Sequence, residues 1–337
     1  MSKGNSMMSR ILKALVIPVF TFVLLQIICG VHGKFIISNA KGFNNFVIYT
    51  AIVMITTIAL SINLNSGRFD FSLGSMAALS SAIAAKLTYQ ILCGGSGSAP
   101  VMMILTVAFG LLLGLISGLL YVILHLPPII TSLGVTLVYE GILFTITSGR
   151  YMMTEVQNKS MTSFTGHWIW GALIIAVVLI VMIIIYDHTK FGYDYKALRE
   201  GQKVAVNTGL KEISNAIGCY TICGGLMGMV GFLNAARNSN IEGGQLNFGS
   251  ISIMFTAFLP MFIGSYIGRY INEKVGFLFA ALCMSMLNST FAVFANQVNA
   301  SMQSIINALL LVIFLIYLNN EGLLKRIFSF GRRKETA

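Results

Sequence analysis

The stretch VMMILTVAFGLLLGLISGLLYVIL, residues 101–124, decides the fold class because it runs for 24 residues without a charged side chain. A transmembrane helix needs about 20 consecutive apolar residues to cross the hydrocarbon core of a bilayer. A second uncharged stretch of similar length occupies residues 169–186. Both stretches therefore predict helices that lie in lipid.

Composition extends this prediction to the whole chain of 337 residues. Hydrophobic residues make up 56% of the sequence and charged residues only 10%, whereas a soluble domain carries about 25% charged residues. A water-exposed surface cannot be built from so few charges. We therefore expect an all-α, polytopic membrane bundle whose main solvent is lipid.

Hydropathy along the chain predicts about ten membrane-spanning helices. The predicted spans are residues 14–30, 46–64, 72–92, 101–124, 129–148, 168–186, 216–233, 249–268, 275–294 and 302–319. Only the short polar break Ser66-Gly67-Arg68-Phe69-Asp70 separates the second span from the third.

The positive charges predict the orientation of the bundle. With the N-terminus in the cytoplasm, 16 of the 22 Lys and Arg residues fall in cytoplasmic segments, as the positive-inside rule requires. We therefore predict that both termini are cytoplasmic. The expected organisation is a cytoplasmic tail at 1–13, a transmembrane domain at 14–319 with a long cytoplasmic loop at 187–215, and a basic cytoplasmic tail at 320–337.

Several classes of function lack support in the sequence. The net charge of +11 is explained by basic cytoplasmic loops, and no interleaved basic and aromatic face indicates nucleic-acid binding. The sequence contains no HExxH, CxxC or GxSxG pattern and no GxxxxGK[ST] phosphate loop. We interpret Cys219 and Cys223, one helical turn apart, as small buried residues. We expect no catalytic site, metal or cofactor in this chain.

Two sets of ionisable residues lie in or beside the predicted spans, where a charge costs about 2.5–3.5 kcal/mol at the helix centre. Glu140 lies near the middle of the fifth span. Either it lines a solute path or contacts a neighbouring helix, or it is a neutral, hydrogen-bonded residue in a helix seam. Arg68 and Asp70 lie in the polar break, where they either pair locally or hold a broken helix open.

The long cytoplasmic loop is polar but keeps an apolar component. Its apolar residues are Ala197, Leu198, Val204, Ala205, Val206 and Leu210. This pattern favours a short helix that docks onto another protein, and a solvated linker is the alternative.

From about residue 61 to residue 317 the sequence resembles the permease subunits of ribose-type, carbohydrate-uptake ABC importers. The most specific match is SGRFDFSLGS at 66–75, in which Arg68 replaces a glycine of the family pattern. The second match is PIITSLG at 128–134, followed by Glu140-Gly141 where the family typically has arginine and glycine.

Two further stretches carry the resemblance. The cytoplasmic loop matches best at Ala205 and at Thr208-Gly209-Leu210, and the Ala235-Ala236-Arg237 motif is intact. Residues 261–269 replace a glycine-rich stretch of the family. The chain is thus identified as a divergent member of this permease family.

The resemblance implies a permease subunit that moves a sugar or sugar-like small molecule inward across the bacterial cell membrane and catalyses no bond change. Its implied partners are ABC ATPase subunits that bind the ATP, a second permease subunit (identical or related), an extracytoplasmic solute-binding protein and membrane lipid. The expected ATPase-coupling residues are Ala197, Gly201, Ala205, Thr208, Gly209 and Leu210. The expected translocation path includes Asp70, Ser72, Glu140 and Asn288. A secondary, ion-driven transporter is the alternative, and Glu140 is the midplane charge in its favour.

Overall fold

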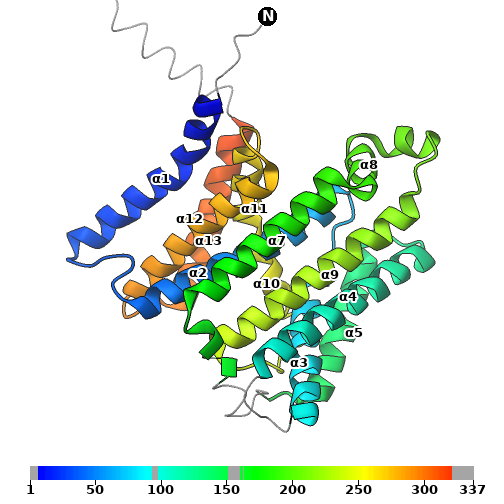
Figure 1. Cartoon of the computed structure of the whole chain (residues 1–337), viewed down its shortest axis with the longest axis horizontal. Helices are drawn as coiled ribbons and strands as arrows, with labels where there is room; N and C mark the ends of the chain where they lie inside the picture. Colours follow the sequence, from blue (N-terminus) through cyan, green and yellow to red (C-terminus); the bar gives the residue numbers. More distant parts are fainter. Residues whose placement is uncertain (1–6, 93–97, 151–159, 162, 321–337) are drawn as a thin grey trace, which may run out of the picture.

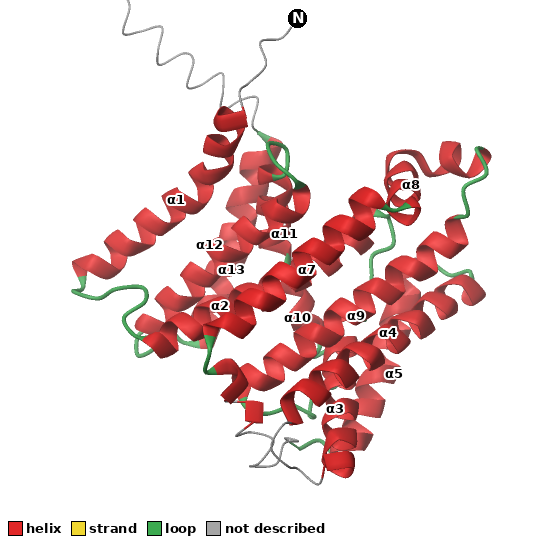
Figure 2. Cartoon of the chain, viewed as in Figure 1, coloured by secondary structure: helices red, strands yellow, loops and turns green. Residues whose placement is uncertain are grey.

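The computed structural model describes residues 7–92, 98–150, 160–161 and 163–320, and the regular elements in this part of the chain are helices (Figure 2). This confirms the all-helical, polytopic fold class. Helix α1 begins at Met7, so the second half of the segment predicted as an N-terminal tail is helical. Of the predicted basic tail at 320–337, all but Asn320 lies outside the described residues.

The elements follow the chain in the order of their labels. They are α1 (Met7–Val31), α2 (Ala40–Asn65), α3 (Leu73–Leu92), α4 (Ser98–Leu124), α5 (Pro128–Thr147), α7 (Trp168–His188), α8 (Lys190–Asn207), α9 (Glu212–Asn238), α10 (Ile251–Phe255), α11 (Phe258–Ile267), α12 (Glu273–Val293) and α13 (Ala300–Asn319).

Eight of these helices are long and apolar enough to cross a membrane: α1, α2, α4, α5, α7, α9, α12 and α13. The other two predicted spans are helical but differ from a simple crossing. The third corresponds to α3, which is rich in serine and alanine. The eighth is divided between the short helices α10 and α11. A count of about ten crossings therefore stays a prediction.

The helices lie roughly side by side, with α1 at one edge of the bundle and α8 at one end (Figure 1). Most of α2 and α9 is buried, and their apolar side chains supply much of the central core. In contrast, no residue of α13 is buried and most of α1 is exposed. This difference fits helices at the edge of the bundle that present apolar side chains to lipid.

Glycines spaced four residues apart hold α4 against α9. A Cβ atom built on Gly110 would lie 2.4 Å from the carbonyl oxygen of Gly224, and one on Gly114 would lie 2.3 Å from that of Tyr220. Backbones approach this closely only where side chains are absent. Cys219 and Cys223 face the interior nearby as buried free thiols.

Asparagine side chains start three of the helices. The side-chain oxygens of Asn39, Asn272 and Asn299 accept hydrogen bonds from Gly42 N, Lys274 N and Met302 N, at 2.7, 2.9 and 2.9 Å. Each bond satisfies a backbone donor that the helix itself leaves unpaired. These caps fix where α2, α12 and α13 begin.

Candidate functional site

The polar break between α2 and α3 is a buried, non-helical segment. Asp70 is completely buried, and its Oδ1 atom accepts hydrogen bonds from Ser72 N at 2.8 Å and Ser72 Oγ at 2.6 Å. The carbonyl of Ser72 then accepts the first hydrogen bond of α3, from Met76 N. Asp70 therefore orders the start of α3, as a carboxylate near a helix N-terminus does.

Arg68 in the same break has a different partner. Its Nη2 atom lies 3.4 Å from Glu212 Oε1 at the start of α9, and its side chain is 4% exposed. The interpretation of Arg68 and Asp70 as a local ion pair is therefore wrong. The break is held open by separate contacts to two different helices.

Glu140, on α5, accepts hydrogen bonds from the backbone just before another helix, α10. Its Oε1 atom accepts hydrogen bonds from Ser250 N at 2.9 Å and Ser250 Oγ at 2.6 Å, and its Oε2 atom accepts one from Phe248 N at 2.9 Å. Because Glu140 is completely buried and both oxygens have donors, its described contacts are those of a hydrogen-bonded link to the start of α10. The structure thus shows both the contact with a neighbouring helix and the hydrogen-bonded place in a helix seam that the two interpretations named.

The beginnings of α3 and α10 meet inside the bundle. A Cβ atom on Gly74 would lie 1.9 Å from the carbonyl oxygen of Ser250, so only glycine allows this approach. We call Asp70, Ser72, Gly74, Glu140 and Ser250 the central joint. It joins two helix N-termini, each with its own buried carboxylate. Asp70, Ser72 and Ser250 are buried, whereas residues 246–249, just before α10, are exposed.

Asn288 does not join this group, although the sequence placed it in the same predicted path. Its Oδ1 atom accepts a hydrogen bond from Arg237 Nη2 at 3.2 Å, and Arg237 Nε donates to Asn45 Oδ1 at 3.0 Å. The guanidinium also lies 4.6 Å from the ring centre of Tyr49. Arg237 therefore ties α2, α9 and α12 together, near the end of the bundle away from α8.

The predicted docking helix in the cytoplasmic loop is α8, which is kinked at Gly201. Its first half is anchored to the bundle. Asp187 accepts hydrogen bonds from Lys196 at 2.7 Å and Lys274 at 2.9 Å. Tyr195 donates a hydrogen bond to the carbonyl of Ile62. Burial raises the pKa of Tyr195, so it remains a neutral donor.

The second half, residues 201–210, is exposed on one side. Val204 is 70% exposed and Val206 is 41% exposed, whereas Ala205 is buried beneath them. The carbonyl of Ala205 accepts hydrogen bonds from Thr208 Oγ1 and Leu210 N, and Gly209 has a φ of +90°, which favours glycine. Of the six predicted coupling residues, all but Ala197 lie in this half. Ala197 is an exposed residue of the anchored half.

An apolar groove follows this second half. It has a volume of about 660 Å³ and is lined by Val206, Leu210, Lys211, Glu212, Ile213, Ser214 and Ile217. Ile213 is 61% exposed although it lies at the start of α9. No sequence pattern marked Ile213 or Ile217. We call Val204, Val206 and Ile213 together with this groove the α8 apolar surface.

The described residues form a multi-pass bundle. Some of its helices begin inside the bundle, and an apolar surface lies at the end that carries α8. This is the architecture of a membrane transport subunit that works with a partner. The sequence matches the family described as branched-chain amino acid transport system / permease component over residues 42–315, and the chain belongs to this family. It is therefore the permease subunit of an ABC importer, and the resemblance seen in the sequence is confirmed. In this family the ATPase is a separate subunit.

Individual relatives are distant. The chain is 24% identical over 257 residues to the fructose import permease protein FruF of Bifidobacterium longum, covering 72% of this chain and 71% of the relative. It is 22% identical over 313 residues to the ribose import permease protein RbsC of Escherichia coli, covering 89% and 91%. It is 22% identical over 244 residues to the autoinducer 2 import system permease protein LsrC of Photorhabdus luminescens, covering 71% and 70%. No solved structure matches.

Proposed function

We propose that this permease moves a sugar or sugar-like solute inward across the bacterial cell membrane, as one of two permease subunits, identical or related. The observation that carries the proposal is the agreement among the relatives, which are named for the import of fructose, ribose or autoinducer 2. ATPase subunits power the transport, and an extracytoplasmic solute-binding protein delivers the solute. Both termini lie in the cytoplasm, and residues 14–319 form the transmembrane domain with its cytoplasmic loop at 187–215.

In this proposal the ATPase binds the α8 apolar surface. Exposed apolar side chains on a polar helix are costly in water and mark a site of protein interaction. Val204, Val206 and Ile213 are such side chains, and they lie at the kinked half of α8 and the start of α9. An ATPase that closes on ATP binding would move this surface with it.

A line of contacts leads from this surface to the central joint. Gln202 in the exposed half of α8 donates a hydrogen bond to Glu212 Oε1 at 2.5 Å, and Arg68 contacts the same oxygen at 3.4 Å. Arg68 lies two residues from Asp70, which orders the start of α3. Motion of α8 therefore has a contiguous route to the broken helices, and solute passes as they rearrange.

The coupling half of the proposal is tested by changing Val204. A Val204→Glu variant places a charge on the apolar surface at a side chain that is 70% exposed. We expect normal membrane insertion, loss of ATPase co-purification in detergent, and loss of solute uptake. The control is Val204→Thr, which keeps nearly the same shape and should retain both. Normal uptake by Val204→Glu would contradict the proposed docking surface.

An ion-driven transporter is not supported by the structure. Glu140 was its best candidate for an ion-binding midplane charge, but hydrogen bonds to Phe248 and Ser250 occupy both of its oxygens. Uptake by vesicles that contain the purified importer should therefore stop when ATP is omitted, with or without an ion gradient. Ion-driven uptake without ATP would reverse this conclusion.

A further inference from the structure

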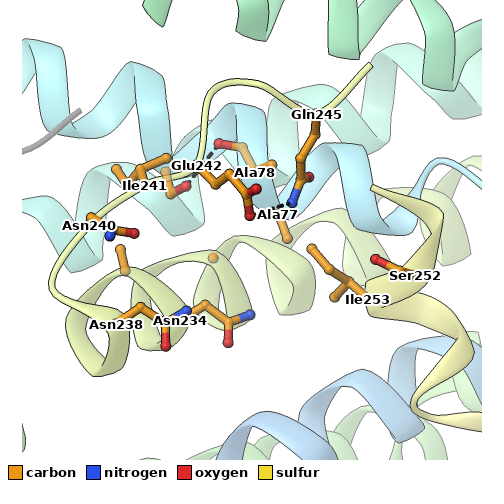
Figure 3. Close-up of a pocket in the computed structure, with 13 residues that line it drawn as sticks. Ala77, Ala78, Asn234, Asn238, Asn240, Ile241, Glu242, Gln245, Ser252 and Ile253 are labelled. Carbon is orange, nitrogen blue, oxygen red and sulfur yellow. Dashed lines mark hydrogen bonds between the residues drawn. The ribbon is translucent and has the colours of Figure 1, made fainter. Parts of the chain in front are cut away.

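A cavity of about 290 Å³ lies between α3, α9, α10 and the loop that joins α9 to α10. Ala77, Ala78 and Ser81 line it from α3, and Asn234 and Asn238 line it from α9 (Figure 3). Asn240, Glu242 and Gln245 come from the loop. Its lining includes Ala77 of α3 and Ser252 of α10, which are close in sequence to Gly74 and Ser250 of the central joint. Its lining residues on α9 lie in the last turns of that helix.

Most of the polar groups in this cavity are side-chain amides. Asn234, Asn238 and Asn240 make no side-chain hydrogen bond within the described part of the chain, so three amides are available to a ligand. Each carries two donor hydrogens and an acceptor oxygen. Amides that present both kinds of group suit hydroxyl groups, which also donate and accept.

Glu242 and Gln245 add acceptor capacity. Gln245 Nε2 donates to Glu242 Oε2 at 3.4 Å, while Gln245 Oε1 is buried and accepts no hydrogen bond from any described residue. A buried acceptor without a donor costs free energy. A small rotation of the Gln245 side chain would let a ligand hydroxyl supply that donor.

The charge of the cavity narrows the ligand class. Glu242 is its charged lining residue, and no Lys, Arg or His is among the described residues that line it. A phosphorylated sugar would meet a carboxylate here and no cation. An amino acid would find an acceptor for its ammonium group in Glu242 but no cation for its carboxylate. The lining thus favours a neutral solute, although the family description refers to branched-chain amino acids.

The size of the cavity suits a small ligand. Ligand pockets usually measure about 300–1,000 Å³, so a cavity of about 290 Å³ suits one small molecule. The close contact between Gly231 and the carbonyl of Ala77, where a Cβ atom would lie 2.1 Å away, closes one side of it. A single monosaccharide fits this description better than a disaccharide.

We propose that this amide-lined cavity is a contact site for a neutral, monosaccharide-sized polyol on its way to the central joint. The inference rests on the proposed function and adds to it the residues that recognise the solute. Asn234, Asn238 and Gln245 hydrogen-bond its hydroxyl groups. Glu242 accepts further hydroxyl donors and repels anions.

The test uses cells that carry the complete importer and measures uptake of labelled ribose, fructose, galactose and leucine. Asn238→Leu and Gln245→Met each replace an amide with an apolar group of similar size. The matched control is Gln297→Met, because Gln297 is an exposed glutamine in the loop before α13, far along the chain from the cavity. Membrane insertion and ATPase co-purification are measured for every variant. If Asn238→Leu does not insert, Asn238→Ser takes its place.

We expect wild-type cells to take up at least one sugar. Each cavity variant should reduce that uptake about tenfold, the scale of one lost hydrogen bond, and Gln297→Met should stay within about twofold of wild type. Normal uptake by cavity variants that insert and bind the ATPase would overturn the contact site and leave the proposed function standing. Wild-type uptake of leucine and of no sugar would overturn both, because the cavity has no cation for a carboxylate.

Discussion

The central joint buries carboxylates, whereas the α8 apolar surface exposes apolar side chains. In the joint, Asp70 and Glu140 are completely buried, yet each carboxylate accepts hydrogen bonds from the start of a helix. At the surface, Val204, Val206 and Ile213 are apolar, yet 41–70% of each is exposed. The interior thus holds carboxylates with hydrogen-bond partners, and the end that carries α8 holds apolar side chains that are largely exposed.

This difference separates structural roles from interaction roles. A buried charge costs several kcal/mol unless hydrogen bonds compensate it, so a fully bonded carboxylate is part of the architecture. An exposed apolar patch gains free energy only when another surface covers it. Substitutions in the joint should therefore lower the stability of the protein, and substitutions on the apolar surface should impair its assembly with a partner.

The largest loss of stability is expected for Glu140→Gln. Glutamine keeps one acceptor oxygen but points an N–H₂ group at a backbone or hydroxyl donor of residues 248–250. We expect a loss of about 3 kcal/mol in the free energy of unfolding, the scale of charge-assisted hydrogen bonds and an unpaired buried donor. Chemical unfolding of the detergent-solubilised protein measures this change.

The matched control for Glu140→Gln is Glu242→Gln, which makes the same chemical change in the loop before α10. Glu242 is exposed, and among the described residues its side chain has only the weak contact from Gln245. Its substitution should change the free energy of unfolding by less than about 0.5 kcal/mol. Equal effects of the two variants would show that Glu140 does not hold the start of α10.

A smaller loss is expected for Gly74→Ala, which tests the other half of the joint. The new methyl group would lie 1.9 Å from the carbonyl oxygen of Ser250, so α3 and α10 must separate. Overpacking of this kind costs about 1–3 kcal/mol, measured by the same unfolding experiment. Gly134→Ala in α5 is the control, because nothing lies within 4 Å of its added atom. A destabilised control with a stable Gly74→Ala would contradict the close approach of α3 and α10.

The sequence predicted these elements well where one residue pattern determines one structure. Uncharged apolar stretches gave the long spans, and the polar break at 66–70 lies where α2 ends and before α3 begins. The mixed composition of the loop predicted a helix, and α8 is that helix. Each of these features depends on local composition and on the length needed to cross a bilayer.

The sequence could not predict which residues meet across the bundle. Glu140 and Ser250 are separated by 110 residues, and no local pattern links them. Arg68 and Asp70 are close in sequence with opposite charges, which suggested a pair, but each bonds to a different element. Asn288 was expected in the translocation path, but its partner Arg237 lies on another helix. The sequence can indicate that a helix starts at Ser250, because a serine precedes an apolar run there. It cannot indicate that Glu140 is the acceptor for the hydrogen bonds of Ser250.

The smallest predicted effect concerns the pair that anchors the first half of α8. Arg199 Nη1 lies 3.1 Å from Glu273 Oε2 at the start of α12, and the two side chains are 38% and 29% exposed. Water and salt screen such a pair. A double-mutant cycle with Arg199→Ala and Glu273→Ala should therefore give a coupling of only about 0.2–1 kcal/mol.

The dependence on ionic strength should distinguish the Arg199–Glu273 pair from the central joint. The coupling between Arg199 and Glu273 should weaken as salt rises from low to about 1 M, because the screening length falls to about 3 Å. The effect of Glu140→Gln should barely change, because no solvent reaches that carboxylate. A coupling above about 2 kcal/mol that resists salt would mean that α8 is held as firmly as α10. In that case an ATPase could not move α8 without also breaking its anchor, and the contrast between a fixed interior and a movable α8 would fail.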